Sequence, residues 1–171
     1  MKPDERKKAR FIILEYLLLS ALFCTLLLFR PVTEMIDING LYTHLIVFLS
    51  TKTIGGLFNI PCTYSDSFIL LPHITLDVKF GCNGLEAVIL YTVAIIVFPA
   101  TWRFKLQGIV AGFVIIQFFN IVRIAVLAYA GVYHGDIFEL IHAYLAQVMM
   151  IAVVLGMLVI YFNYVKGQAP P

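Results

Sequence analysis

Four long apolar stretches dominate the pattern of the chain, and short polar segments separate them. The stretches cover residues 11–29, 85–100, 106–130 and 141–162. A helix needs about 20 apolar residues to cross the hydrocarbon layer of a membrane, and each stretch is near that length. The pattern predicts an all-α polytopic membrane protein with four transmembrane helices. We expect residues 1–171 to form a single membrane-embedded domain.

The segment 30–84, between the first two predicted spans, is less uniform. Three leucines recur at helical spacing in residues 41–49, but polar residues and Gly55-Gly56 interrupt the run. This pattern favours a helix that lies in the membrane interface, with a fifth span as the alternative. Apolar and polar residues then alternate from Ile74 to Phe80, which is typical of a half-buried strand. We expect that strand to belong to a small β-hairpin that starts near Phe68.

Composition narrows the class of protein. Hydrophobic residues make up 61% of the chain and charged residues only 13%, which excludes an ordinary soluble domain. The net charge of +2 is small and dispersed, so we expect no nucleic-acid partner. The lipid bilayer is the expected surrounding of the predicted spans.

Basic residues are unevenly distributed around the spans, and this predicts the orientation of the chain. Eight of them flank one set of span ends: Lys2, Arg6, Lys7, Lys8, Arg10, Arg103, Lys105 and Lys166. Only Arg30, Lys52 and Lys79 flank the other set. By the positive-inside rule both termini lie in the cytoplasm. The segment 30–84 and the loop 131–140 then face outward.

Cys82 is the first candidate for chemistry. It lies between Gly81 and Gly84, where the predicted strand gives way to the span that begins at Leu85. Glycine allows unusual backbone torsions and close approach of another chain, and the dipole at a helix N-terminus favours a thiolate. Cys82 is therefore a candidate nucleophile. A structural thiol, or a disulfide with Cys62 outside the membrane, is the alternative.

Arg123 and His142 are expected to lie close to Cys82. Arg123 precedes Ala130, at the outer end of the third span, by seven residues, or roughly 10 Å along the helix. His142 opens the fourth span. Because a guanidinium at mid-bilayer costs about 2.5 to 3.5 kcal/mol, Arg123 should face the protein interior and serve a function.

A thiol, an imidazole and a guanidinium in one pocket have complementary chemistry. Cys82 would attack a carbonyl carbon, while His142 would accept the thiol proton and later protonate the leaving amine. Arg123 would stabilise the oxyanion, since its pKa is too high for it to act as a base. This arrangement predicts acyl transfer through a thioester.

Three further residues are expected to support the site. Asn83 adjoins the candidate nucleophile. Asn120, one helical turn before Arg123, would hold the guanidinium in place. Glu86, four residues after Cys82 on the expected helix face, would orient the guanidinium or the imidazole.

Each of these residues also has a structural interpretation. Asn120 and Glu86 would then only join helices by hydrogen bonds. Arg123 would balance a carboxylate such as Glu86 or Glu139, and His142 would cap the start of a helix. The sequence alone leaves both interpretations open.

Three short motifs carry a family resemblance. In chain order they are Gly81-Cys82-Asn83-Gly84-Leu85-Glu86-Ala87, Asn120-Ile121-Val122-Arg123-Ile124 and His142-Ala143-Tyr144-Leu145-Ala146-Gln147. The chain resembles the exosortase/archaeosortase family in these motifs, and exosortase H in particular, over about residues 55–162. Asn83 stands where serine is common elsewhere in the broader family, which we interpret as a subfamily feature.

The resemblance implies a cysteine transpeptidase with Cys82, Arg123 and His142 as its catalytic residues. Its protein substrates would be anchored in the membrane and end in a short motif, a transmembrane helix and a basic tail. Cleavage would leave a thioester on Cys82, which an acceptor would then attack. The implied location is the bacterial inner membrane, with the site facing the periplasm. We expect no cofactor and no metal, since the three cysteines lack zinc-type spacing.

The predicted topology has a consequence for substrate binding. A substrate helix in the bilayer would bring its membrane-proximal motif to the depth of Cys82. The strand that ends at Phe80 would be able to pair with an extended segment of such a substrate.

Two non-enzymatic functions are the alternatives. Gln117, Asn120 and Arg123 share a helix face and would line the path of a small channel or transporter. The chain would otherwise be a structural membrane partner that stabilises another protein. Either function would tolerate the replacement of Cys82 by alanine, whereas a cysteine transpeptidase would not.

Overall fold

The computed structural model describes residues 3–28, 38–79 and 81–168. Its elements in chain order are α1 (Pro3–Leu28), α3 (Ile38–Phe58), β1 (Thr63–Ser65), β2 (Phe68–Leu70), β3 (Thr75–Asp77), α4 (Leu85–Val97), α5 (Trp102–Tyr133), α6 (Gly135–Leu140), the π-helical turn η1 (Ile141–Leu145) and α7 (Ala146–Gln168).

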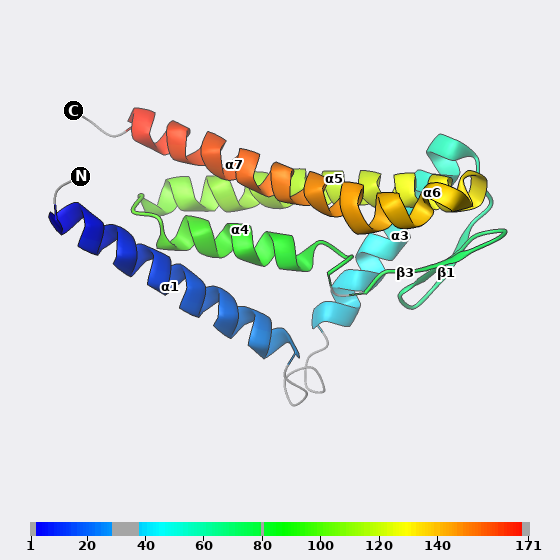
Figure 1. The fold of residues 1–171 in the computed structure, drawn as a ribbon, viewed down its shortest axis with the longest axis horizontal. Coiled ribbons are helices and arrows are strands. Elements are labelled where there is room, and N and C mark those ends of the chain that lie inside the picture. The colour runs from blue at the N-terminus through cyan, green and yellow to red at the C-terminus, as the bar shows by residue number, and fades with distance from the viewer. Residues whose placement is uncertain (1–2, 29–37, 80, 169–171) are drawn as a thin grey trace.

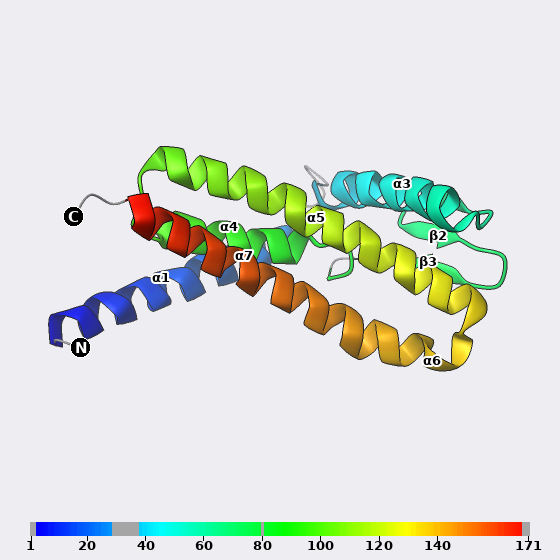
Figure 2. The same cartoon turned by 90° about the horizontal axis from the view of Figure 1, so that it is seen from above.

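The helices α4, α5 and α7 run side by side and form the centre of the molecule (Figures 1 and 2). Helix α1 packs against α4, and α3 packs against the half of α5 that lies beyond α4. The first residues of α1 and the last residues of α7 lie at one end of the molecule, while the sheet and α6 lie at the other (Figure 1).

Three stretches of the described residues are long and apolar enough to cross a membrane: Gly40–Phe58, Trp102–Tyr133 and Gly135–Gln168. The predicted spans 106–130 and 141–162 fall within the last two. The predicted span 11–29 lies in α1, except that residue 29 is outside the described residues.

Helix α4 is shorter than the span predicted at residues 85–100. It has 13 residues and ends at Val97, where Phe98 adopts an extended backbone before Pro99. Thirteen residues are fewer than the roughly 20 that cross the hydrocarbon layer. Helix α4 by itself is therefore too short to cross the hydrocarbon layer, and the number of spans stays a prediction.

Helix α3 confirms that this segment forms a helix, and its stretch Gly40–Phe58 is also long and apolar enough for the alternative, a fifth span. The hydroxyls of Thr51 and Thr53 donate to the carbonyls of Val47 and Leu49, at 2.8 and 2.9 Å. A hydroxyl that bonds to the carbonyl four residues earlier is satisfied within its own helix. Polar residues therefore do not end α3, which runs through Gly55 to Phe58.

The sheet confirms the predicted hairpin and adds one strand. The three antiparallel strands have the order β1-β2-β3. Between β2 and β3, Phe68 pairs with Asp77 and Leu70 with Thr75. Strand β1 is only three residues long and exposed throughout, so it carries no apolar alternation that would have predicted it.

Two apolar clusters hold these elements together. One lies between α3, the sheet and the second half of α5, and includes Val47, Ile69 and Ala128. The other lies between α4, α5 and α7 and centres on Tyr91, whose hydroxyl donates to the carbonyl of Gly108 at 3.1 Å. The site described below lies at the sheet end of the molecule, next to the first cluster.

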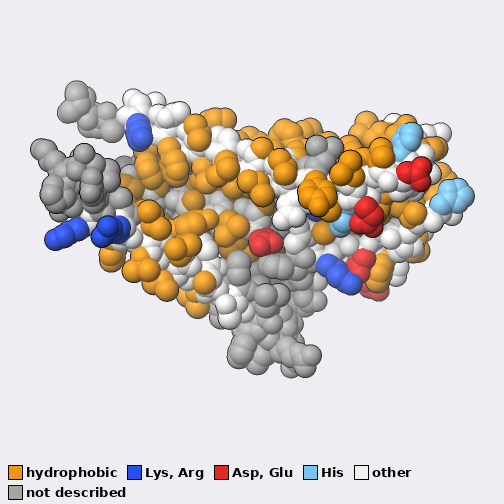
Figure 3. All heavy atoms as spheres, viewed as in Figure 1, with side chains coloured by type: hydrophobic (Ala, Val, Ile, Leu, Met, Phe, Trp, Pro, Cys, Tyr) orange, Lys and Arg blue, Asp and Glu red, His pale blue; other side chains and the backbone are white. Residues whose placement is uncertain are grey.

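The surface has the distribution of side chains that a bilayer requires. Large apolar side chains stay exposed along the helices, among them Leu106 at 54% and Val148 at 63%. Hydrophobic side chains cover most of the visible face, while acidic and histidine side chains gather at the sheet end (Figure 3). Apolar exposure on this scale is costly in water, so these helices need lipid or protein around them.

Candidate active site

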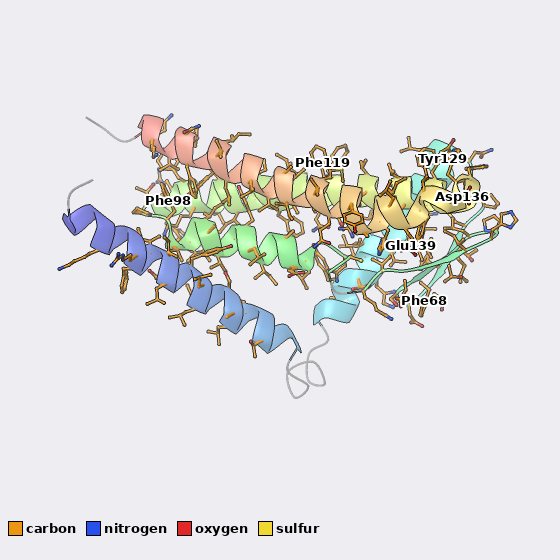
Figure 4. The ribbon with its side chains drawn as sticks, viewed as in Figure 1. Phe68, Phe98, Phe119, Tyr129, Asp136 and Glu139 are labelled. Carbon is orange, nitrogen blue, oxygen red and sulfur yellow. The ribbon has the colours of Figure 1, made fainter. Side chains whose placement is uncertain are left out.

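A cavity of about 240 Å³ lies where the sheet, α5 and the α6–η1 segment meet. Cys82, Arg123 and His142 all line it, together with the carboxylates Asp77 and Glu139. Glu139 extends from α6 on the side that faces the sheet (Figure 4). The structure therefore brings the three predicted site residues to one cavity from three separate segments of the chain.

Cys82 lies in a tight turn that precedes α4. Gly81 and Gly84 both have positive φ, at +91° and +80°, which side-chain-bearing residues rarely adopt. The backbone N–H groups of Cys82 and Asn83 both donate to the carbonyl of Lys79, at 2.8 and 3.0 Å. The thiol is thus held half-buried at the cavity, and these two N–H groups are already occupied.

Asn83 fixes this turn to three helices. Its side-chain oxygen accepts from the N–H of Leu85 at 3.0 Å, and its side-chain nitrogen donates to the hydroxyl of Thr43 at 2.9 Å. Its carbonyl accepts from the amide of Asn120 at 2.8 Å. Asn83 is fully buried, so these bonds tie the thiol turn to α3, α4 and α5.

Asn120 and Glu86 do not have the contacts predicted for them. Asn120 holds the backbone of Asn83, and the described residues include no hydrogen bond from it to Arg123. Glu86 is exposed, is not one of the cavity residues, and makes no ion pair with Arg123. The predicted relation requires Cys82 to be part of the helix, but α4 begins only at Leu85 and the positive φ of Gly84 separates Cys82 from Glu86.

Arg123 is buried and forms no ion pair with any of the residues that the structure describes. The residue is only 8% exposed, and its buried Nε has no hydrogen-bond partner. In the part of the chain that the structure describes, neither Glu86 nor Glu139 forms an ion pair with it. Asp77 and Glu139 line the same cavity, but among the described residues neither pairs with the guanidinium, so it suits an anion that enters the cavity.

His142 lies on the π-helical turn η1, which joins α6 to α7. Its ring stacks on Phe138, with ring centroids 5.8 Å apart and an interplanar angle of 2°. A π-helical turn inserts one residue into a helix and often occurs at functional sites. His134 lies directly after α5, beside Tyr129, and is not one of the cavity residues.

Cys62 is not joined to Cys82, since both are free thiols in the structure. The Cys62 thiol donates to the carbonyl of Thr51 at 3.4 Å and lines a different hollow of about 530 Å³, beside Lys52. Burial raises the pKa of the Cys62 thiol, although a backbone hydrogen bond with Gly55 acts in the opposite direction. A raised pKa disfavours the thiolate that a nucleophile requires.

Two carboxylates of the cavity, Asp77 and Glu139, were not among the predicted site residues. Asp77 accepts from the Ser67 hydroxyl at 2.8 Å and pairs with Lys79 at 2.6 Å. Desolvation raises the pKa of Asp77, but the bonds from Lys79 and Ser67 outweigh it, so the pKa lies below its usual value. The alternating strand pattern placed Asp77 and Lys79 on one face of the strand, so the ion pair between them could have been predicted from the sequence.

The fold and the cavity define a polytopic membrane protein with a thiol, a guanidinium and an imidazole at one end of its helices. The model of the transmembrane exosortase family (Exosortase_EpsH) matches residues 13–162. The chain therefore belongs to the transmembrane exosortase family, which confirms the predicted family. Searches of the curated proteins and of the solved structures found no match.

Gly84→Ala is expected to destabilise the protein by about 1 to 2 kcal/mol, because a side chain is strained at φ +80°. A Cβ there would also lie 2.9 Å from the Asn120 side chain. The measurement is the thermal unfolding midpoint of the purified protein in detergent. Gly156→Ala is the matched control, since a Cβ at Gly156 meets nothing within 4 Å. Equal midpoints for the two variants would show that the turn adapts.

Proposed function

We propose that the protein is a membrane cysteine transpeptidase that cleaves C-terminal sorting signals and transfers the cleaved protein to an acceptor. The observation that carries the proposal is the single cavity that Cys82, Arg123 and His142 line. Membership in the transmembrane exosortase family supports it, because that family is in general associated with transpeptidation of sorting signals.

The reaction would proceed in two acyl transfers. His142 removes the proton of the Cys82 thiol, and the thiolate sulfur attacks the scissile carbonyl carbon. The tetrahedral intermediate collapses to a thioester, and the leaving amine takes the proton from His142. The acceptor then attacks the thioester carbonyl while His142 takes the acceptor's proton, and the departing Cys82 thiolate receives that proton from His142.

Arg123 is the proposed donor to the oxyanion. The N–H groups of Cys82 and Asn83 already donate to Lys79, so the turn has neither of them left for this purpose. The Arg123 guanidinium lines the same cavity, and within the described residues no ion pair occupies it. A preorganised donor in a water-poor site is worth far more than one in water.

We further propose that the cavity faces the periplasm from the inner membrane. The cavity lies at the sheet end, opposite the end where α1 begins and α7 finishes (Figure 1). The basic residues at that second end favour the cytoplasm. A substrate whose helix lies in the bilayer would then present its membrane-proximal motif at the cavity.

His142→Gln is expected to slow cleavage by about 100- to 10,000-fold, the range typical of a lost general base. Glutamine is polar and close in length but has no proton to exchange near neutral pH. The measurement is the cleavage rate of one sorting-signal protein per unit of enzyme in the membrane. His134→Gln is the matched control, expected near the wild-type rate. Similar rates for both variants would remove His142 from the mechanism.

The test of the whole proposal uses the purified protein in proteoliposomes. A synthetic peptide with the motif, apolar helix and basic tail of a substrate encoded in the same genome is added with a small primary amine. We expect cleavage of the peptide and its ligation to the amine. Ion flux across the vesicle wall with no cleavage would favour a channel instead.

A further inference from the structure

Strand β3 forms one edge of the sheet, and its hydrogen bonds to β2 show which of its backbone groups point outward. The N–H of Val78 donates to the carbonyl of Ser67 at 2.8 Å. At the other end of the strand, the N–H of Leu71 donates to the carbonyl of Ile74 at 3.0 Å. Backbone groups in an antiparallel ladder alternate between the two sides of a strand. Residues 74, 76 and 78 therefore bond toward β2.

It follows that the N–H and C=O groups of Thr75 and Asp77 point away from β2. Because β3 is the last strand of the sheet, no strand among the described residues pairs with them on that side. An edge with unpaired backbone groups is a ready template for another extended chain. Asp77 is also held by Ser67 and Lys79, which keeps this edge in place.

The candidate active-site cavity runs along this same edge. Four consecutive residues, Thr75 to Val78, line it together with Cys82, Arg123 and His142. Successive side chains of a strand point to opposite faces of the sheet, so one face alone would contribute only alternate residues. A cavity that four consecutive residues line must lie beside the strand's edge.

We propose that the outer edge of β3 binds the substrate as an added strand, with the backbone of Thr75 and Asp77 bonding to the extended segment that carries the scissile bond. This inference rests on the proposed function and deepens it. The occupant is an extended peptide because its backbone alone supplies donors and acceptors in the matching alternation. Such pairing binds the main chain of the substrate. Alternate side chains of the substrate then contact the cavity.

The decisive experiment uses the wild-type protein in proteoliposomes. Synthetic peptides with the motif, apolar helix and basic tail of one substrate from the same genome each carry a single N-methyl group, moved along the extended segment one amide at a time. Every second position is expected to lower kcat/KM by about 5- to 10-fold, since each methyl removes one backbone hydrogen bond, and the positions between should have little effect. Uniform effects, or none, would overturn the added strand.

Failure of the inference and failure of the proposed function give different results. If the unmethylated peptide is cleaved but methylation shows no alternation, the transpeptidase stands and the added strand does not. If the unmethylated peptide is not cleaved, the proposed function fails, and this inference fails with it.

Proline variants test the same edge on the enzyme. Thr75→Pro removes an N–H that faces the cavity and keeps the bonds to β2, so kcat/KM should fall about tenfold or more. Tyr64→Pro is the matched control: Tyr64 pairs with Ile69, whose backbone bonds toward β3, so the N–H of Tyr64 faces the opposite edge of the sheet. The reaction of Cys82 with a small thiol reagent should be unchanged in both. Wild-type kcat/KM in a normally abundant Thr75→Pro variant would contradict the inference.

Discussion

Cys82→Ala is expected to leave the sorting-signal protein uncleaved in the membrane, a loss of at least about 1000-fold in rate. Removal of a nucleophile leaves only the weak catalysis that the rest of a site provides. Cys62→Ser should cleave at nearly the wild-type rate, because Cys62 lines a different hollow and has a raised thiol pKa. Comparison of the two variants distinguishes the loss of a nucleophile from the loss of a structural cysteine.

The measurement is an immunoblot of substrate and product beside the membrane abundance of each variant. Similar abundance is expected, since alanine is smaller than cysteine and the Cys82 side chain has no hydrogen bond within the described residues. If both variants lost cleavage equally, the two thiols would have a structural role instead.

Arg123→Lys is expected to accumulate at the wild-type level and to cleave at least about 100-fold more slowly, the typical cost of one lost oxyanion donor. Lysine keeps the positive charge but replaces a planar fork of N–H groups with a point charge on a flexible stem. A residue that only balanced charge would tolerate this change.

The control for this variant is Arg103→Lys, which makes the same exchange at an exposed position in the first turn of α5. Both variants are compared by cleavage rate per unit of enzyme. If the cleavage rate of Arg123→Lys were within a few-fold of the rate of Arg103→Lys, Arg123 would only balance charge. Another group would then have to donate to the oxyanion.

Patterns of apolar and polar residues in the sequence predicted the helices, one strand and the main site residues. Apolar runs located the helices, and the alternation before Phe80 located β3. The cost of a guanidinium among apolar residues pointed to Arg123, and distances along the helices placed it level with Cys82 and His142. These three residues could be chosen because each stands near the end of a predicted helix on the same side.

The supporting contacts could not be predicted, because they join residues far apart in the chain. Asn83 bonds to Thr43 and Asn120, which are 40 and 37 residues away. The helical relation assumed between Cys82 and Glu86 failed because Gly84, which lies between them, has a positive φ and α4 begins only at Leu85. The threonine hydroxyls of α3 bond to carbonyls of the same helix, which an apolar pattern does not show.

The most direct test of the proposed thioester mechanism is the capture of the acyl-enzyme. Wild-type protein is incubated with the substrate peptide in the absence of an acceptor, quenched in acid, digested and examined by mass spectrometry. The thioester mechanism predicts that the cleaved substrate is attached to Cys82 through a bond that hydroxylamine breaks, and that Cys62 carries none. Cleavage with no adduct on Cys82, or an adduct on another residue, would contradict it.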